Sequence, residues 1–238
     1  MNVMSSSLEK MAGGKLDFAV LPTVAAKTLR AKNLDYKIVA TIIHGGLYIC
    51  GTDRTITRIN DLKGRTIHVM AGNTPPEMML RHLISAGGME PETDVRFDRS
   101  YPTHKDLSKA AEDGLAELCI LSEPFVSQAL EANGNLHILL DIGKEWKAAE
   151  GSLPPVTAFF CKDSLDCSCN NAVEHTVTAL HNSCEWVKGN PEKAAEAVVG
   201  LGLFNNKKAI QASVNHSYFD VMPVSDSTKE IADFLAIW

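Results

Sequence analysis

The stretch that decides the fold runs from Asp61 to Glu77 and reads DLKGRTIHVMAGNTPPE. Its first residues, Asp61 to Gly64, have the composition of a turn. Thr66 to Met70 form a short apolar run rich in β-branched residues. Such a run, preceded by a turn, predicts a β-strand, and Ala71-Gly72 then makes a tight connection to the next element.

A helix is predicted directly after this connection, because several start signals coincide there. Asn73 or Thr74 is placed to cap the helix, and Pro75 suits its first position. Thr74 and Glu77 have the spacing of a capping box. One apolar face and a closing glycine pair follow, namely Met79, Leu80, Leu83, Ile84 and Gly87-Gly88. Unpaired backbone N–H groups at such a helix start favour an anion or another polar acceptor.

Composition and charge exclude several classes of protein. The chain has 238 residues, of which 45% are hydrophobic and 22% charged, as in an ordinary globular protein of one large or two small domains. A net charge of −6, with no cluster of Lys and Arg, argues against a nucleic-acid-binding surface. No apolar run is long enough for a membrane span. Residues 1–5 also lack the features of a signal peptide, so the protein is cytosolic or its leader lies outside this numbering.

The cysteine pattern does not indicate a disulfide scaffold in a chain of this length. Cys119 lies in a strand-like apolar run and is expected to be a buried thiol. Cys167 and Cys169 are the only close pair, and no C-x-x-C spacing suggests a zinc site. Unpaired thiols are favoured, with a bridge from Cys167 or Cys169 to Cys184 as the main alternative.

Strands and helices alternate through the first two thirds of the chain. Strands are predicted at 18–21, 36–43, 47–51, 66–70, 94–98, 117–121, 136–140 and 156–161, and further helices at 7–12, 24–32, 105–113 and 125–132. This alternation predicts an α/β fold with mostly parallel sheets covered on both faces. Residues 151–155 form a linker-like break, and from Asn171 onward the chain is expected to be helical throughout.

Two regions resemble each other when the sequence is shifted by 100 positions. Gly14 then aligns with Gly114, and the strand before Pro22-Thr23 aligns with the strand before Ser122-Glu123. Each region reads as helix, glycine, strand, polar turn and helix. The pattern suggests two sheet-based lobes of similar build.

Catalytic motifs are not apparent. The sequence has no G-x-S-x-G elbow, no His pair with zinc spacing and no glycine-rich phosphate loop. We therefore expect a protein that is not an enzyme and that carries no cofactor or metal, although a site assembled from distant loops leaves no such motif.

The motifs taken together resemble solute-binding proteins of ABC transporters, in the nitrate, sulfonate and thiamine-precursor subgroup. The resemblance rests on residues 14–23, the crossing at 45–51, Asp61-Leu-Lys-Gly-Arg-Thr-Ile67 and Asn190-Pro-Glu-Lys-Ala-Ala195. It implies a two-lobed type II periplasmic-binding-protein-like fold with a hinge. Members of the family begin with a strand and a helix, and a second strand follows. In this chain Val3-Met4 is expected to be the end of that second strand. Roughly 40 residues of the family pattern are therefore expected to lie before Met1.

The resemblance also implies a domain division and a partner. Lobe I would comprise residues 1–53 and 156–238, with the C-terminal helices packed on it, and lobe II residues 54–155. The hinge would lie near Gly51–Asp53 and Leu153–Val156. We expect a monomer without a transmembrane segment that binds a small polar or anionic solute between the lobes and delivers it to an ABC permease. The full-length form would be periplasmic or an extracellular lipid-anchored protein.

The candidate ligand-binding residues follow from where strands meet helices, because ligands of α/β sheets lie beyond the carboxyl ends of the strands. Hydroxyls and exposed N–H groups at these points suit a carboxylate, a sulfonate, nitrate or a polar heterocycle, whereas Glu123 suits an amine or a ring N–H. His44 is also interpretable as a structural histidine, and Glu123 as a first-turn residue favoured by the helix dipole. The predicted ligand-binding set is Pro22, Thr23, His44, Gly46, Tyr48, Asn73, Thr74, Ser122 and Glu123.

Two alternatives remain open at this point. The first is a cytosolic enzyme on the same fold, similar to the chorismate dehydratases of the menaquinone pathway. The second is a ligand-sensing domain of a regulator, although no helix-turn-helix is evident. A solute released unchanged on denaturation would distinguish binding from turnover.

Overall fold

The computed structural model describes residues 3–72, 74–168 and 171–238. The stretch at 61–77 forms the expected unit: a short 3-10 helix, η1 (Ile59–Leu62), leads into β4 (Thr66–Met70), and α3 (Pro75–Ala86) follows. Alternate residues of β4, Ile67 and Val69, are fully buried. The apolar positions of α3 recur at helical spacing and are buried on one face, as the sequence predicts.

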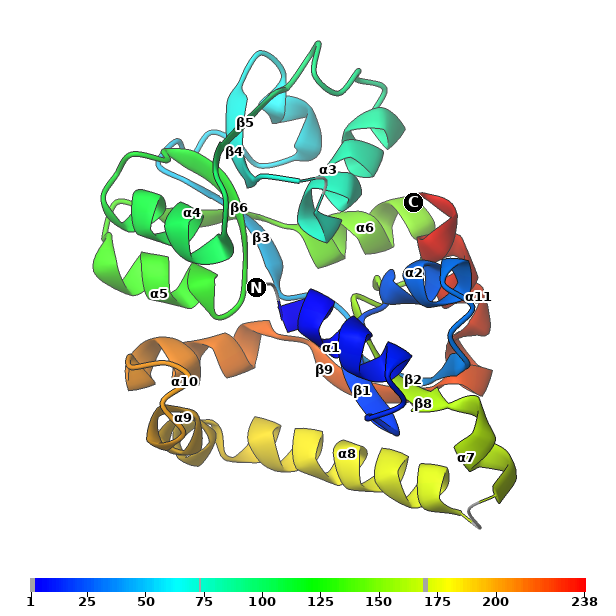
Figure 1. Cartoon of the computed structure of the whole chain (residues 1–238). Helices are drawn as coiled ribbons and strands as arrows, with labels where there is room; N and C mark the ends of the chain where they lie inside the picture. Colours follow the sequence, from blue (N-terminus) through cyan, green and yellow to red (C-terminus); the bar gives the residue numbers. More distant parts are fainter. Residues whose placement is uncertain (1–2, 73, 169–170) are drawn as a thin grey trace. The chain divides into compact units, whose positions relative to one another are not determined.

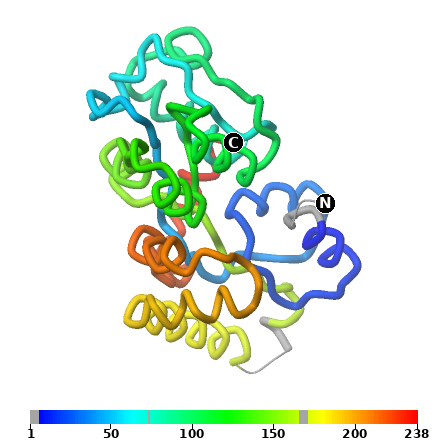
Figure 2. The backbone as a smooth tube through the Cα atoms, turned by 90° about the vertical axis from the view of Figure 1, so that its left-hand side faces the viewer, coloured from blue at the N-terminus to red at the C-terminus, as the bar shows by residue number. Residues whose placement is uncertain are grey.

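The chain folds into two units, each made of separate segments. Unit 1 comprises Met1–His44, Pro154–Trp186 and Phe219–Trp238, and unit 2 comprises Gly45–Leu153 and Val187–Tyr218. The path of the backbone through these segments can be followed by colour in Figure 2. The sequence-based division placed residues 45–53 and 187–218 in the first lobe. They lie in unit 2, because β3 (Leu47–Gly51) pairs within its sheet and α10 (Lys207–His216) packs on α5 (Phe125–Ala132).

Unit 2 is built on a five-stranded sheet of order β5-β4-β6-β3-β7. Its strands β5 (Arg96–Tyr101), β4 and β6 (Leu118–Ser122) are parallel, whereas β3 runs antiparallel to both β6 and β7 (His137–Asp141). Figure 1 shows α4 (His104–Glu112) and α5 on one side of this sheet, and α3 and α6 (Ile142–Glu150) on the other. Coverage of both faces explains the apolar strands, of which β3 is buried along its whole length.

Unit 1 has a four-stranded sheet of order β1-β8-β2-β9. Here β8 (Thr157–Lys162) runs antiparallel to β1 (Phe18–Pro22) and β2 (Tyr36–Ile43), and β9 (Phe219–Pro223) runs antiparallel to β2. Two apolar clusters flank the sheet, one including residues of α1 and α2 and the other including Cys184 of α8. The helices of this unit are α1 (Val3–Ala12), α2 (Ala25–Ala31), α7 (Asp163–Ser168), α8 (Ala172–Gly189, which continues into unit 2) and α11 (Val224–Ala236).

The two units repeat one arrangement of strands. In unit 1, β1 and β2 are parallel and flank the antiparallel β8; in unit 2, β6 and β7 are parallel and flank the antiparallel β3. A helix joins the flanking strands in both units, α2 in one and α5 in the other. The similarity seen at a shift of 100 positions therefore has a structural basis, since it aligns β1-α2 with β6-α5.

Other sequence expectations also differ from the structure. The sheets are not mostly parallel, because the named strand pairs of unit 1 and both pairings of β3 in unit 2 are antiparallel. Val3 and Met4 begin α1 rather than ending a strand. The region after Asn171 is not helical throughout, because β9 is interposed between α10 and α11 and pairs with β2. The helices α6 and α7 were not predicted; α9 (Pro191–Gly200) and α10 lie where helices were expected.

The described cysteines include two fully buried thiols in the sheet of unit 2. Cys119 is buried as expected, and it lies opposite Cys50 in the β3–β6 pairing. Burial raises the pKa of the Cys119 thiol to about 12, so it stays protonated at neutral pH. The alternative bridge from Cys167 or Cys169 to Cys184 involves side chains outside the described residues. Within the described part of the chain, no helix combines the length and apolarity needed to cross a bilayer.

Candidate functional site

The corner between β1 and α2 holds a buried hydroxyl. Thr23, which follows Pro22, is fully buried, and its backbone N–H donates to the carbonyl of Val156 at 3.0 Å. Its Oγ1 has no hydrogen-bond partner among the described residues. A buried hydroxyl without a partner costs roughly 1–3 kcal/mol, so such a group marks a place where a partner is expected.

The corner between β4 and α3 holds a second such hydroxyl. Thr74 occupies the N-cap position of α3, and the exposed fraction of the residue is 7%. Its Oγ1 makes no capping bond and has no other partner in the described ranges. The neighbouring Asn73, also predicted to bind ligand, lies outside the described residues.

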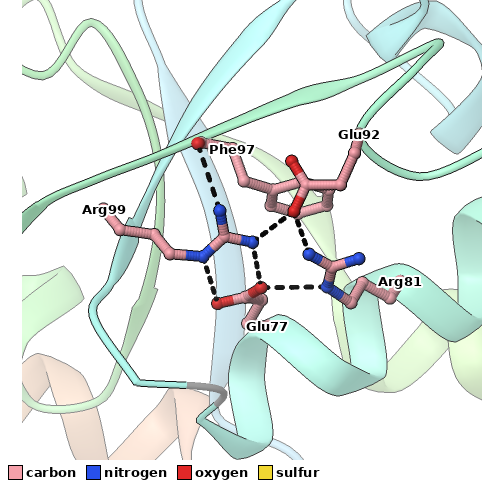
Figure 3. A network of polar contacts seen from close by, with 5 residues as sticks. All are labelled: Glu77, Arg81, Glu92, Phe97 and Arg99. Carbon is pink, nitrogen blue, oxygen red and sulfur yellow. Dashed lines mark hydrogen bonds and ion pairs between the residues drawn. The ribbon is translucent and has the colours of Figure 1, made fainter.

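The predicted capping box at α3 does not form. Glu77, instead of accepting from the N-cap, is fully buried and binds two arginines (Figure 3). Its Oε1 accepts from Arg81 Nε at 2.9 Å, and its two oxygens accept from Arg99 Nη2 at 2.5 Å and Nε at 3.2 Å. Glu92 completes the network by accepting from both arginines, with 2.5 Å to Arg99 Nη2. The network draws the Glu77 carboxylate away from the helix start, so it does not accept from the backbone N–H of Thr74 as a capping box requires.

The start of α3 also offers fewer N–H donors than the sequence analysis assumed. Pro75 and Pro76 occupy the first two helical positions, and proline has no backbone N–H. Two of the donors that make a helix start attractive to an anion are therefore missing. The Thr74 hydroxyl is the polar side-chain group left at this corner among the described residues.

The corner between β6 and α5 has its polar groups paired. Glu123, directly after Ser122, has a side chain that is only 4% exposed. Its Oε1 lies 3.0 Å from Ser127 Oγ and 2.9 Å from His216 Nδ1, and Ser127 N donates to Oε2 at 3.2 Å. Burial raises the pKa of the Glu123 carboxyl, and the hydrogen bonds from Ser127 and His216 oppose the rise. The carboxylate is thus committed to internal partners in this state.

Gly46 and Tyr48 of the β3 segment adjoin this corner. The carbonyl of Gly46 accepts from Glu123 N at 2.8 Å, and Gly46 has a φ of 75°, which glycine adopts without strain. Tyr48 donates its hydroxyl proton to the carbonyl of His216 at 2.7 Å. Burial raises the pKa of Tyr48 well above its usual value, so its hydroxyl remains a donor.

His44 lies in unit 1 and is held by internal contacts. Its Nε2 is 3.1 Å from Thr41 Oγ1 and 3.1 Å from the carbonyl oxygen of Asp220. Burial lowers the pKa of the imidazole, which favours the neutral form. These contacts are those of a structural histidine.

The predicted set is thus divided between the units. Gly46, Tyr48, Ser122 and Glu123 come together in unit 2, where Thr74 also lies, whereas Pro22, Thr23 and His44 belong to unit 1. Sequence reasoning did not identify His216 and Ser127, the partners of Glu123. Ser127 lies one turn after Glu123, a spacing that was available as a signal; His216 is separated by 93 residues and gave none.

No group of three His, Cys, Asp or Glu side chains suited to a metal occurs among the described residues.

In both units a reversed strand lies between parallel neighbours, and the chain passes from one unit to the other and back. These features define the type II periplasmic-binding fold. Residues 3–122 match the family model described as NMT1/THI5 like, and the chain belongs to that family.

Solved structures agree with this fold. The crystal structure of an ABC transporter from Parabacteroides distasonis has 18% identity and a TM-score of 0.84, with 100% of this chain and 79% of that chain covered. The periplasmic aliphatic sulphonate binding protein SsuA from Escherichia coli has 16% identity and a TM-score of 0.78, with 99% and 75% covered. The periplasmic nitrate-binding protein NrtA from Synechocystis has 18% identity and a TM-score of 0.55, with 82% and 55% covered. A comparison with functionally curated proteins gives no match.

Proposed function

We propose that this chain is the substrate-binding component of an ABC transporter, which binds a small polar or anionic solute and delivers it to a permease. The NMT1/THI5-like family and the type II periplasmic-binding fold support the proposal. Such a role needs no covalent chemistry, only a difference in solute affinity between conformational states. Action outside the cytoplasm, as a monomer, is part of the same proposal.

The observation that carries the proposal is the pair of buried threonine hydroxyls without partners. Thr23 belongs to unit 1 and Thr74 to unit 2, and each follows the carboxyl end of a strand and precedes a helix. In open α/β sheets this is where ligands bind. We infer that each hydroxyl hydrogen-bonds to the solute, which offsets the cost of its burial.

The solute class follows from the donors that remain. Because Pro75 and Pro76 remove two N–H groups from the start of α3, a polar group that pairs with the Thr74 hydroxyl fits this corner better than a fully charged oxyanion. The Glu123 carboxylate is occupied by Ser127 and His216, so a basic group of the solute has no ready partner there.

The experiment is to purify the chain from cells and identify any co-purified small molecule by native mass spectrometry. Binding of that molecule is then measured by calorimetry for the wild type, Thr23→Val and Thr74→Val. Both substitutions keep the side-chain shape and remove the hydroxyl. We expect affinity to fall about tenfold in each while the ligand-free protein is as stable as wild type or more so, because an unsatisfied buried hydroxyl has been removed.

Serine-to-alanine substitution at the exposed Ser225 provides a matched control, for which no change in affinity is expected. Unchanged affinity in both threonine variants would overturn the proposed site. Conversion of the bound molecule to a product, rather than its release unchanged, would favour the enzyme alternative over transport.

A further inference from the structure

A pocket of about 580 Å³ lies within unit 2, and its lining does not include Thr74. It is formed where the start of α4 and the first turns of α5 meet the end of α9 and the connection to α10. The side chains that matter to its chemistry are Lys105, Phe125, Gln128, Val199, Leu203 and Phe204. None of them belongs to the ligand-binding set predicted from the sequence, and the volume is in the range of small-molecule sites.

Aromatic rings form an ordered wall of this pocket. The Phe125 ring stacks on His104, with centroids 5.6 Å apart and planes within 9°, and it meets Phe204 edge-on at 5.7 Å. Burial lowers the pKa of His104, so this ring is a neutral support for Phe125. Two contacts hold Phe125 in place before any ligand arrives, and pre-organised rings of this kind favour a flat aromatic molecule.

The pocket also exposes apolar surface that other residues do not cover. Leu203 is 66% exposed, although it lines the cavity together with Val199 and Phe204. An exposed leucine alone would carry little meaning, but here it continues the aromatic wall. A ligand with an apolar body would remove this surface from water.

Lys105 is the charged residue of the pocket lining. Lys105 is exposed and forms no ion pair within the ranges that the structure describes. The nearest acids along the same helix have other partners: Asp106 accepts from Thr103, and Glu112 accepts from Gln128 at 2.9 Å and lies 3.7 Å from Lys109 Nζ. A free ammonium beside an aromatic wall suits an anionic group attached to a ring.

We propose that this pocket is a second binding site, which takes a small aromatic carboxylate with its ring against Phe125 and Phe204 and its carboxylate at Lys105. The site goes beyond the proposed solute transport, because its residues and those of the threonine corners do not overlap. It would allow a second small molecule to bind unit 2 independently of the transported solute.

The test uses 2-naphthoate as the probe and its neutral analogue 2-naphthylmethanol as the comparison, with binding to the full chain measured by calorimetry. Phe204→Ala is expected to weaken binding of both compounds about fivefold, because it removes one face of the ring site. Lys105→Gln is expected to weaken only the naphthoate, by about threefold. Methyl NMR signals of Val199 and Leu203 should shift on titration.

Matched controls are Leu201→Ala, an exposed apolar neighbour outside the lining, and Lys109→Gln, one turn further along α4. Neither should change naphthoate affinity, and Thr74→Val should leave it unchanged as well. Equal binding of the acid and the alcohol would overturn the assignment of a carboxylate. Loss of naphthoate binding in Thr74→Val would place the probe at the solute site instead, and it would overturn the second site while leaving the transport proposal standing.

Discussion

Glu123 and His216 lie 93 residues apart in the chain, yet the Glu123 Oε1 and His216 Nδ1 atoms are joined by a 2.9 Å hydrogen bond. The Glu123 side chain is 4% exposed and the His216 side chain 37%. The bond ties the end of α10 to the corner between β6 and α5. His216 therefore acts as a positioning residue for a corner that the sequence had marked as part of the ligand site.

Replacing His216 by alanine should destabilise unit 2. The buried Glu123 would keep Ser127 as its side-chain partner, so its ionised form would be less well solvated, at a cost of about 1–3 kcal/mol at pH 7. Burial raises the pKa of the Glu123 carboxyl. The loss of stability in His216→Ala applies above that pKa, where Glu123 is ionised, and it disappears as the pH falls through the pKa and the carboxyl is protonated. Urea unfolding at pH 7 and pH 4 measures both quantities.

The matched control for this prediction is His216→Gln, which retains a side-chain donor and should recover part of the loss. A destabilisation of equal size at pH 4 and pH 7 would show that packing, rather than the charge of Glu123, accounts for the effect of His216→Ala.

Glu77→Gln should lower the free energy of unfolding more than Glu92→Gln, a change to the exposed acid of the same network. Glu77 is fully buried between Arg81 and Arg99, and breaking one partner of a buried ion pair costs about 3 kcal/mol. Glu92→Gln is the control, because Glu92 accepts from the same arginines but its side chain is 45% exposed, and surface pairs contribute under about 1 kcal/mol. Similar midpoints of urea unfolding for both variants would contradict the prediction.

Acid should destabilise unit 1 through His44. The folded-state pKa of His44 is lowered by burial, so the stability that its neutral form contributes is present above the unfolded pKa of about 6.5 and is lost as pH falls below it. One such group adds a slope of up to about 1.4 kcal/mol per pH unit. His44→Gln should reduce the slope of unfolding free energy between pH 7 and 5.5, whereas His175→Gln, at an exposed position of α8, should not. An unchanged slope in His44→Gln would assign the acid sensitivity to other groups.

The sequence predicted most of the fold because most of its elements carry local signals. The start of α3 after Thr74-Pro75, the apolar strands and the two matching segments of the repeat are each contained within short windows. The missed helix α6 also had such signals: Asp141 accepts from Lys144 N, Trp146 is buried and Gly151 closes the helix with a φ of 88°. Gly143 near its start concealed them, because glycine is unfavourable within a helix.

Non-local features were beyond the reach of the sequence. Strand β9 is five residues long and is defined by its pairing with β2, far away in the chain. The failed capping box at Glu77 has the same cause, since Arg99 of β5 competes for the carboxylate from 22 residues away. Local propensity cannot reveal a partner that only the folded chain supplies. The sequence therefore marked the corners of Thr23 and Thr74, whose ligand contacts stay a prediction, but it did not reveal the partners that fix Glu123.

The two prolines at the start of α3 lead to a prediction about solute charge. Pro76→Ala adds one backbone N–H at the second helical position, where it points toward a ligand at the helix start. We expect the affinity for methanesulfonate, measured by calorimetry, to rise about fivefold, as an added N–H donor to an anion contributes on the order of 1 kcal/mol. Pro91→Ala, outside the helix, is the control for general effects of removing a proline, and should leave the affinity unchanged. If methanesulfonate binds equally to Pro76→Ala and wild type, the anion does not approach α3, and its contacts in unit 2 must come from another corner.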